Sequence, residues 1–411
     1  MRIALITPHA TPPGLVGTSG GGPRVVPLAQ ALAELGHDIT VYARKDSPSL
    51  PATIKASPRV TIEHVPAGPA KRMGTDDVAP HAGQLGDQLA RRWRKSPPDV
   101  AHAYSWPSGL AALAAARDLG VPVVQTFHSL TSPVRGDGLR ESRESMARLR
   151  LKVCLARNVQ AVLARSSGEM RELARLGVPR ASMRVVPWGV DTAYFVPEGP
   201  AARRNGQPRL LAVGPMTEHR RLDIIFRALA DVPGAELLLA CAPMPGQPDG
   251  DRLHRALSRL AGKLRVSDRV SFAGETSWED LPALLRSADV LVSAAWDSLF
   301  DAAALQAMAC GTPVVAPAVG FYADSVIDGT TGMLVPPGQP AILARRIRRL
   351  LSSPLHLDAF GIAAADRARS RYSWDRIARE TVKAYERFHP VPAPEEEDEL
   401  EPELELTEAL A

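Results

Sequence analysis

Short apolar runs rich in β-branched residues alternate with amphipathic helical stretches along the first half of this chain. This alternation constrains the fold most, because each run reads as a buried strand and each stretch as a helix that returns the chain. The pattern predicts βαβ units on an open parallel sheet. Strands are expected at Arg2–Thr7, 38–43, 99–103, 122–127 and 161–164, and helices at 27–35, at 108–119 and before Gly177.

A Pro- and Gly-rich break at residues 197–208 interrupts the alternation, and the pattern then restarts. The fold class expected is α/β, with two Rossmann-like, doubly wound domains (1–196 and 209–371) joined by 197–208 as a linker. Ligands of such sheets bind beyond the carboxyl ends of the strands, which predicts a site in the cleft between the domains. In the second domain, strands are expected at 210–213, 235–240, 270–273, 290–293 and 314–316, and a helix at Leu222–Ala230.

Composition agrees with two domains that bury a core, because the chain has 411 residues and 45% of them are hydrophobic. No apolar run reaches 18 residues, so no membrane-spanning helix is expected. The N-terminus reads as a first strand rather than a signal peptide. The three cysteines are widely spaced, which argues against a disulfide framework or a zinc site. These features together predict a cytoplasmic protein.

Charge is distributed unevenly along the chain. Residues 395–408 carry nine acidic side chains and no basic one. The whole chain has a net charge of +4, so the rest of the chain, called the body here, has a net charge of +13. Such a body attracts anions, among them nucleotide sugars and phospholipid headgroups, although a solvated Arg-rich surface is an equally simple reading. No zinc-finger or RNA-binding motif supports nucleic acid. The segment 389–411, acidic and rich in Pro, is expected to be a disordered tail.

A glycine cluster, Gly20-Gly21-Gly22, follows the first expected strand and precedes a helix. Glycine lets the backbone approach a diphosphate, and a helix N-terminus favours negative charge. The cluster does not form a dinucleotide fingerprint, because Val25 stands at the last glycine position, and it lacks the Lys of a Walker A loop. It is interpreted either as a phosphate contact through Gly20 and Gly21 or as a plain flexible turn.

Two runs in the second half carry a more specific pattern. Residues 307–316 read AMACGTPVVA, where a helix of small residues ends at Gly311 and turns into a β-branched strand. Residues 328–337 read DGTTGMLVPP, a turn that leads into a short strand. Either run alone is explained as an ordinary junction between a helix and a strand or as a turn.

Together these runs resemble the family-4 glycosyltransferases, whose pattern is close to EAMACGTPVVA followed by DGxTGxLVPP. Further similar segments follow in the family's order and extend the resemblance over about residues 1–388: LGHDITV (35–41), QTFHS (125–129), PWGVDTAYF (187–195) and YSWD (372–375). The resemblance implies the GT-B fold, with two domains facing across a cleft. It also implies that a last helix, 372–388, crosses back to the first domain.

The resemblance implies a nucleotide-sugar-dependent glycosyltransferase that transfers a hexose-type sugar with retention of configuration. The donor, a UDP- or GDP-sugar, would lie on the C-terminal domain and the acceptor, a small molecule or lipid of unknown identity, mainly on the N-terminal domain. His128 matches a family histidine near the donor sugar, although a histidine that caps a strand end is the structural alternative. No cofactor and no metal are expected, and the histidines show no metal-ligand spacing.

Residues 214–221, GPMTEHRR, align with the family segment GRLxxxKG, and two of its positions differ. Pro215 stands in place of the Arg, and Arg220 in place of the Lys that would contact the diphosphate. Arg220 keeps the charge and is the expected catalytic contact to the diphosphate, with Gly214 and Arg221 as further donor-binding residues. A solvated pair of loop arginines is the alternative for Arg220 and Arg221.

The family's paired glutamates are also replaced. The alignment places Gln306 at the second Glu and Ser298 at the first. Gln306 retains an acceptor for a ribose hydroxyl, and Asp297 or Asp301 is a candidate for the missing carboxylate. The donor-binding set expected here includes Ser298, Asp301 and Gln306. Ser298 also fits the first position of a capping box, which would start a helix there.

Two functions stay open from the sequence. One is an active glycosyltransferase with a modified donor site, and the other is a catalytically degenerate relative that binds a ligand or a partner enzyme. The four changed positions Pro215, Arg220, Ser298 and Gln306 support the second. An oxidoreductase is disfavoured because the dinucleotide fingerprint is missing. The basic body also leaves peripheral contact with the inner face of a membrane open.

Overall fold

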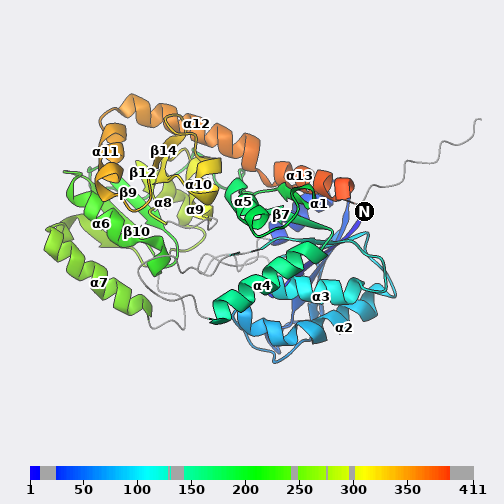
Figure 1. Ribbon diagram of the computed structural model, residues 1–411. Helices are drawn as coiled ribbons and strands as arrows, with labels where there is room; N and C mark the ends of the chain where they lie inside the picture. Colours follow the sequence, from blue (N-terminus) through cyan, green and yellow to red (C-terminus); the bar gives the residue numbers. More distant parts are fainter. Residues whose placement is uncertain are drawn as a thin grey trace, which may run out of the picture.

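The computed structural model describes residues 1–9, 25–127, 130, 143–241, 249–274, 276–295 and 301–388. Two α/β domains, each built on one sheet, follow one another along the chain (Figure 1). The central strands are buried, whereas β3, β8 and β11 are partly exposed, and apolar side chains from the strands and the covering helices form the cores. The predicted α/β class with two doubly wound domains is confirmed.

The N-terminal sheet has eight strands in the order β3-β4-β2-β1-β5-β6-β7-β8. Pairing is parallel except between β3 and β4, so the expectation of a purely parallel sheet is wrong at this edge. The strand order reverses at β1, which lies between β2 and β5. The strands are β1 (Arg2–Thr7), β2 (Asp38–Arg44), β3 (Thr53–Ser57), β4 (Val60–Val65), β5 (Val100–Ala103), β6 (Val123–Gln125), β7 (Ala161–Ala164) and β8 (Met183–Val185).

Helices cover both faces of this sheet (Figure 1). Two of them begin at serine caps directly after a strand: the Ser105 hydroxyl accepts from the Ser108 amide, and the Ser166 hydroxyl from the Glu169 amide. These caps fix the carboxyl edge of the sheet. The elements are α1 (Val25–Glu34), η1 (Asp76–His81), α2 (Ala82–Trp93), α3 (Trp106–Ala116), α4 (Arg143–Asn158), α5 (Ser167–Arg175) and η2 (Arg180–Ser182).

The C-terminal sheet has six parallel strands in the order β11-β10-β9-β12-β13-β14. Counted from β9, this is the 3-2-1-4-5-6 order of the doubly wound dinucleotide-binding fold. The order reverses between β9 and β12, whose residues Leu210 and Val290 are paired. The strands are β9 (Arg209–Val213), β10 (Glu236–Ala240), β11 (Val270–Phe272), β12 (Val290–Val292), β13 (Val314–Pro317) and β14 (Gly332–Val335).

Helix α6 begins and ends at the predicted residues, whereas α7 and the hairpin β3–β4 were not predicted. Among the described residues, no helix has the length and apolar character needed to cross a membrane. The helical elements of the second half are η3 (Glu218–Arg220), α6 (Leu222–Ala230), α7 (Asp249–Leu264), η4 (Ser267–Arg269), α8 (Leu281–Arg286), α9 (Ala302–Ala309), α10 (Gly320–Ser325), α11 (Pro340–Leu351), α12 (Pro354–Tyr372) and α13 (Trp374–Phe388).

The last helix, α13, lies beside α1 of the N-terminal domain, whereas α12 before it lies on the C-terminal domain (Figure 1). Ile377, Ala378 and Tyr385 are buried in one core cluster with strands of the N-terminal sheet. The chain crosses between the domains at Ser373, where the Val190 amide donates to the Tyr372 carbonyl at 2.7 Å. Helix α13 is thereby packed into the N-terminal domain.

A buried polar network joins α13 to the N-terminal sheet. The Thr126 hydroxyl uses its one hydrogen to donate to the Leu163 carbonyl. Its oxygen is therefore the acceptor for Nε2–H of His102 at 2.9 Å. Nδ1 of His102 is then the acceptor for the Tyr385 hydroxyl at 2.7 Å. Burial lowers the pKa of His102 to about 3, because a charged imidazole would lose its hydration there.

This network predicts loss of stability in acid. His102 titrates near 6.5 in the unfolded chain and near 3 in the folded one, so its contribution is complete above pH 6.5 and falls as pH drops toward 3. We expect the free energy of unfolding to fall by about 2 kcal/mol between pH 7 and pH 5 from this residue. Urea unfolding of the wild type and His102→Gln at both pH values tests it. If the free energy of unfolding changes equally between pH 7 and pH 5 in the two proteins, the prediction is contradicted.

Candidate functional site

The candidate site lies where the C-terminal sheet changes winding direction. Strand β9 ends at Val213, and Gly214 follows it with a φ of +129°, which side chains with a Cβ rarely adopt. A Cβ at Gly214 would lie 2.3 Å from Nη2 of Arg220. Glycine therefore lets the guanidinium of Arg220 pack directly against the backbone at the carboxyl end of β9. Ligands of doubly wound sheets bind at this kind of position.

Arg220 is held by an aspartate from the neighbouring unit of the sheet. Its Nη1 donates to Oδ2 of Asp301 at 3.0 Å, and 19% and 5% of the two side chains are exposed. Asp301 also caps α9, because its Oδ1 accepts from the Ala303 amide at 3.0 Å. One carboxylate thus fixes both the start of α9 and the direction of Arg220.

Tyr322 of α10 completes this centre. Its hydroxyl donates to Oδ2 of Asp301 at 2.6 Å and lies 2.6 Å from the Ser293 hydroxyl, just after β12. Burial and the neighbouring carboxylate raise the pKa of Tyr322 well above its usual value, so the phenol remains a donor. Ser293, Tyr322, Asp301 and Arg220 form one hydrogen-bonded chain, which we call the arginine centre.

Arg220 keeps its positive charge at any ordinary pH. Burial acts to lower the pKa of Arg220, but the Asp301 carboxylate outweighs it and raises that pKa above its usual value. Burial raises the pKa of the neighbouring Cys241 thiol to about 11, so it adds no charge. A guanidinium has five N–H donors, and among the described residues Asp301 is its hydrogen-bond acceptor. Further donors are therefore available for an anion.

The other predicted residues on the same loop and helix occupy different environments. Arg221 has a left-handed backbone, and its guanidinium contacts both carboxylate oxygens of Asp223 at 3.0 and 3.2 Å. Gln306 lies in α9 and is 7% exposed, and its amide has no hydrogen-bond partner among the described residues. Their predicted roles in donor binding stay predictions.

Four predicted site residues, His128, Gly20, Gly21 and Ser298, lie outside the described residues, as does Asp297. The capping box predicted at Ser298 therefore also lies outside the described residues, and in the structure α9 begins at Ala302 with Asp301 as its cap. Asp301 accepts from the amide two residues ahead, which satisfies a free N–H of the first turn. The predicted carboxylate at this end of α9 is thus present, but its partner in the structure is Arg220.

The contributions of Tyr322 and Ser293 were missed from the sequence. The available signal was the pair of aromatic residues Phe321-Tyr322 just before Asp324. Asp324 itself lies on another surface, where its carboxylate accepts from the Ser167 amide and hydroxyl of α5. Among the described residues, no cluster of three or more His, Cys, Asp or Glu has the arrangement of a metal site.

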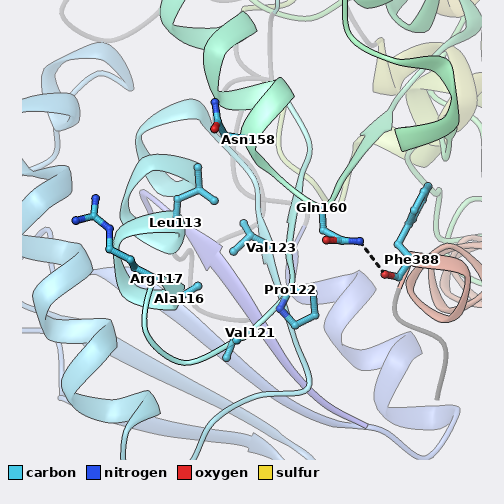
Figure 2. A pocket seen from close by; sticks show the side chains of 10 residues that line it. Leu113, Ala116, Arg117, Val121, Pro122, Val123, Asn158, Gln160 and Phe388 are labelled. Carbon is cyan, nitrogen blue, oxygen red and sulfur yellow. Dashed lines mark hydrogen bonds between the residues drawn. The ribbon is translucent and has the colours of Figure 1, made fainter. Parts of the chain in front are cut away.

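A cavity in the N-terminal domain is lined by none of the residues of the arginine centre, and Figure 2 shows its lining. It has a volume of about 350 Å³ and lies at the starts of β6 and β7, the edge opposite to the carboxyl ends of these strands. Gln160 closes one side by donating to the Phe388 carbonyl at 3.2 Å. The lining residues are Leu113, Ala116, Arg117, Gly120, Val121, Pro122, Val123, Asn158, Gln160 and Phe388.

Comparison with known families assigns both halves of the chain to glycosyltransferases. Residues 18–194 match the family described as Glycosyltransferase Family 4, and residues 207–353 match Glycosyl transferases group 1. The gap between the two matches, residues 195–206, overlaps most of the Pro- and Gly-rich break at 197–208.

Relatives match over almost the whole chain. D-inositol 3-phosphate glycosyltransferase from Nocardiopsis dassonvillei is 31% identical over 404 residues, which covers 93% of this chain and 94% of the relative. Sucrose-phosphate synthase from Thermosynechococcus elongatus has a TM-score of 0.82 at 28% identity, covering 93% of this chain and 98% of that one. HepE of Anabaena, solved with UDP and glucose, has a TM-score of 0.71 at 19% identity, covering 93% and 98%. The chain therefore belongs to the family-4 glycosyltransferases and has their GT-B fold.

Proposed function

We propose that this chain transfers a hexose-type sugar from a nucleoside diphosphate donor, UDP- or GDP-linked, to a small phosphorylated acceptor with retention of configuration. The observation that carries the proposal is the pairing of Arg220 with Asp301 at the switch point of the C-terminal sheet. The partly exposed guanidinium lies where a doubly wound sheet holds its ligand, and its direction is fixed by a buried carboxylate.

The chemistry of transfer explains the need for a fixed cation. The bond from the anomeric carbon to the diphosphate breaks, the acceptor hydroxyl bonds to the same face, and its proton goes to the departing diphosphate. Negative charge grows on the diphosphate in the oxocarbenium-like transition state. A pre-oriented guanidinium stabilises this charge without reorganising during the reaction. Asp301 lowers the net charge of the arginine centre but prevents Arg220 from turning away.

The proposed acceptor class combines the names of two relatives with charges on the N-terminal domain. The relatives are named for inositol 3-phosphate and for sucrose phosphate. At the carboxyl end of β5, Asp76 accepts from Trp106 Nε1 at 2.9 Å and from Arg148 Nη1 at 2.5 Å. Lys152, one turn after Arg148, is buried beside them, and burial lowers its pKa while Asp76 opposes this effect. The proposed position for the acceptor phosphate is beside these two basic side chains, near the carboxyl end of β5.

The alternative of a relative without activity gains no support from these comparisons, because the relatives carry the names of glycosyltransferases. The proposal also keeps His128 as a contact to the donor sugar, Gly20 and Gly21 as diphosphate contacts, and Ser298 and Gln306 as contacts to the donor hydroxyls. No metal and no cofactor are included in it.

The proposal is tested by a transfer assay with purified protein. UDP- and GDP-hexoses are each incubated with inositol phosphates, hexose phosphates and the same acceptors without phosphate. We expect one nucleotide to support transfer, phosphorylated acceptors to exceed their neutral counterparts, and NMR of the product to show the anomeric configuration of the donor. An inverted product would contradict retention, and equal use of neutral acceptors would contradict the acceptor class.

A further inference from the structure

Helix α10 directs two side chains to two different domains. Tyr322 points into the C-terminal domain and contacts Asp301 of the arginine centre. Asp324, two residues later, contacts Ser167 of α5 in the N-terminal domain. Figure 1 shows α10 beside α5, at the contact between the two domains. The proposed function uses neither Tyr322 nor this contact directly.

At the arginine centre, Tyr322 fixes the oxygen on which Arg220 depends. Oδ2 of Asp301 accepts from the Tyr322 hydroxyl at 2.6 Å and from Arg220 Nη1 at 3.0 Å, while Oδ1 is held by the Ala303 amide. Tyr322 is 1% exposed, so no water replaces its hydroxyl. A shift of Tyr322 therefore moves Asp301 or breaks its bond, and Arg220 follows.

At the domain contact, both carboxylate oxygens of Asp324 accept hydrogen bonds from Ser167. Its Oδ2 accepts from the Ser167 amide at 2.6 Å and its Oδ1 from the Ser167 hydroxyl at 2.5 Å. Ser167 is the first residue of α5, and a carboxylate at a helix N-terminus is favoured by the helix dipole. A Cβ on Gly168 would lie 3.2 Å from the Gly320 Cα, so the two backbones pack closely.

Helix α10 has few other ways to move, because α12 holds its end. Arg367 donates to the Asp324 and Ser325 carbonyls, both at 2.7 Å, and the Tyr372 hydroxyl lies 3.2 Å from the Asp324 carbonyl. The C-terminal end of this six-residue helix is thus held by α12, and its two side chains Tyr322 and Asp324 are only two residues apart.

We propose that Tyr322 is a positioning residue for Arg220, and that α10 makes the order of the arginine centre depend on the contact between Asp324 and Ser167. The proposal rests on the proposed function where it concerns the donor. When the domains separate at this contact, α10 loses one support and the arginine centre loosens. By linkage, a donor bound at Arg220 strengthens the contact between the domains in return.

The first test is a double-mutant cycle on donor affinity, measured by calorimetry. We expect Tyr322→Phe to weaken donor binding ~10-fold and Asp324→Ala to weaken it several-fold. In the double variant, the loss of affinity should be smaller than the product of the two single losses. Ser167→Thr keeps the hydroxyl and should bind as the wild type does. Asp366→Ala, on the exposed side of α12, is the matched control. Unchanged affinity in Tyr322→Phe, or strictly multiplicative effects, would overturn the proposal.

The second test needs no donor, so it separates this proposal from the proposed function. Hydrogen exchange of the amides between Gly214 and Arg221 is compared in the unliganded wild type, Asp324→Ala and Asp366→Ala. We expect faster exchange in Asp324→Ala alone, although Asp324 does not contact this segment. Unchanged exchange there overturns the coupling. If the wild type binds no donor, the proposed function fails while this measurement still decides the coupling.

Discussion

Arg220→Ala is expected to lower kcat/KM by a factor of about 10² to 10⁴, because one charged donor to the departing diphosphate is worth several kcal/mol in a protected site. Part of the loss should appear in kcat, since the negative charge is larger in the transition state than in the bound donor. The measurement is steady-state kinetics with the donor that supports transfer.

Two further variants make the result specific. Arg220→Ala leaves the buried Asp301 carboxylate without its cation, so Arg220→Lys, which retains a charge, is measured beside it. We expect the lysine variant to recover part of the lost kcat. Arg349→Ala, on an exposed position of α11, should leave kinetics unchanged. Wild-type kinetics in Arg220→Ala would remove Arg220 from the diphosphate site.

Gly214→Ala is expected to damage the same site from the backbone. The added methyl would lie 2.3 Å from Nη2 of Arg220 and on a backbone with a φ of +129°, so the guanidinium must move and the loop becomes strained. We expect donor affinity to fall at least ~10-fold and stability to fall by about 1–3 kcal/mol. Calorimetric titration and urea unfolding measure the two effects.

Gly234 supplies a matched control for this prediction. It also has a positive φ, +75°, but no atom lies within 4 Å of a Cβ placed there. Gly234→Ala should therefore lose stability while keeping donor affinity. If Gly214→Ala and Gly234→Ala lose the same stability and neither loses affinity, the packing of Arg220 on Gly214 has no role in binding.

Much of the fold could be predicted because its strands are short buried runs of β-branched residues. The ends of α6 were predicted correctly, since an apolar helical period fills Leu222–Ala230 and Pro and Gly follow it. The hairpin β3–β4 was missed because β3, Thr53–Ser57, is partly exposed and lacks a strong alternation of apolar residues. Its antiparallel pairing depends on contacts that no local pattern encodes.

The site was predicted in part. Gly214 and Arg220 come from an aligned motif and Asp301 was a candidate for the missing carboxylate; the structure brings these three together, while their roles in donor binding stay predictions. Whether Ser298 or Asp301 caps α9 could not be decided locally, because both residue types are common caps. The contact of Tyr322 with Asp301 bridges 21 positions and depends on the adjacent placement of β12 and β13, so it required the tertiary structure.

The most direct test of the central claim, that the arginine centre binds a nucleoside diphosphate donor, is a calorimetric titration of the protein with UDP, GDP and ADP and with their hexose conjugates. The account predicts micromolar binding of UDP or GDP and of its sugar conjugate, lost in Arg220→Ala. Absence of binding by every nucleotide, or equal binding by wild type and Arg220→Ala, would contradict it.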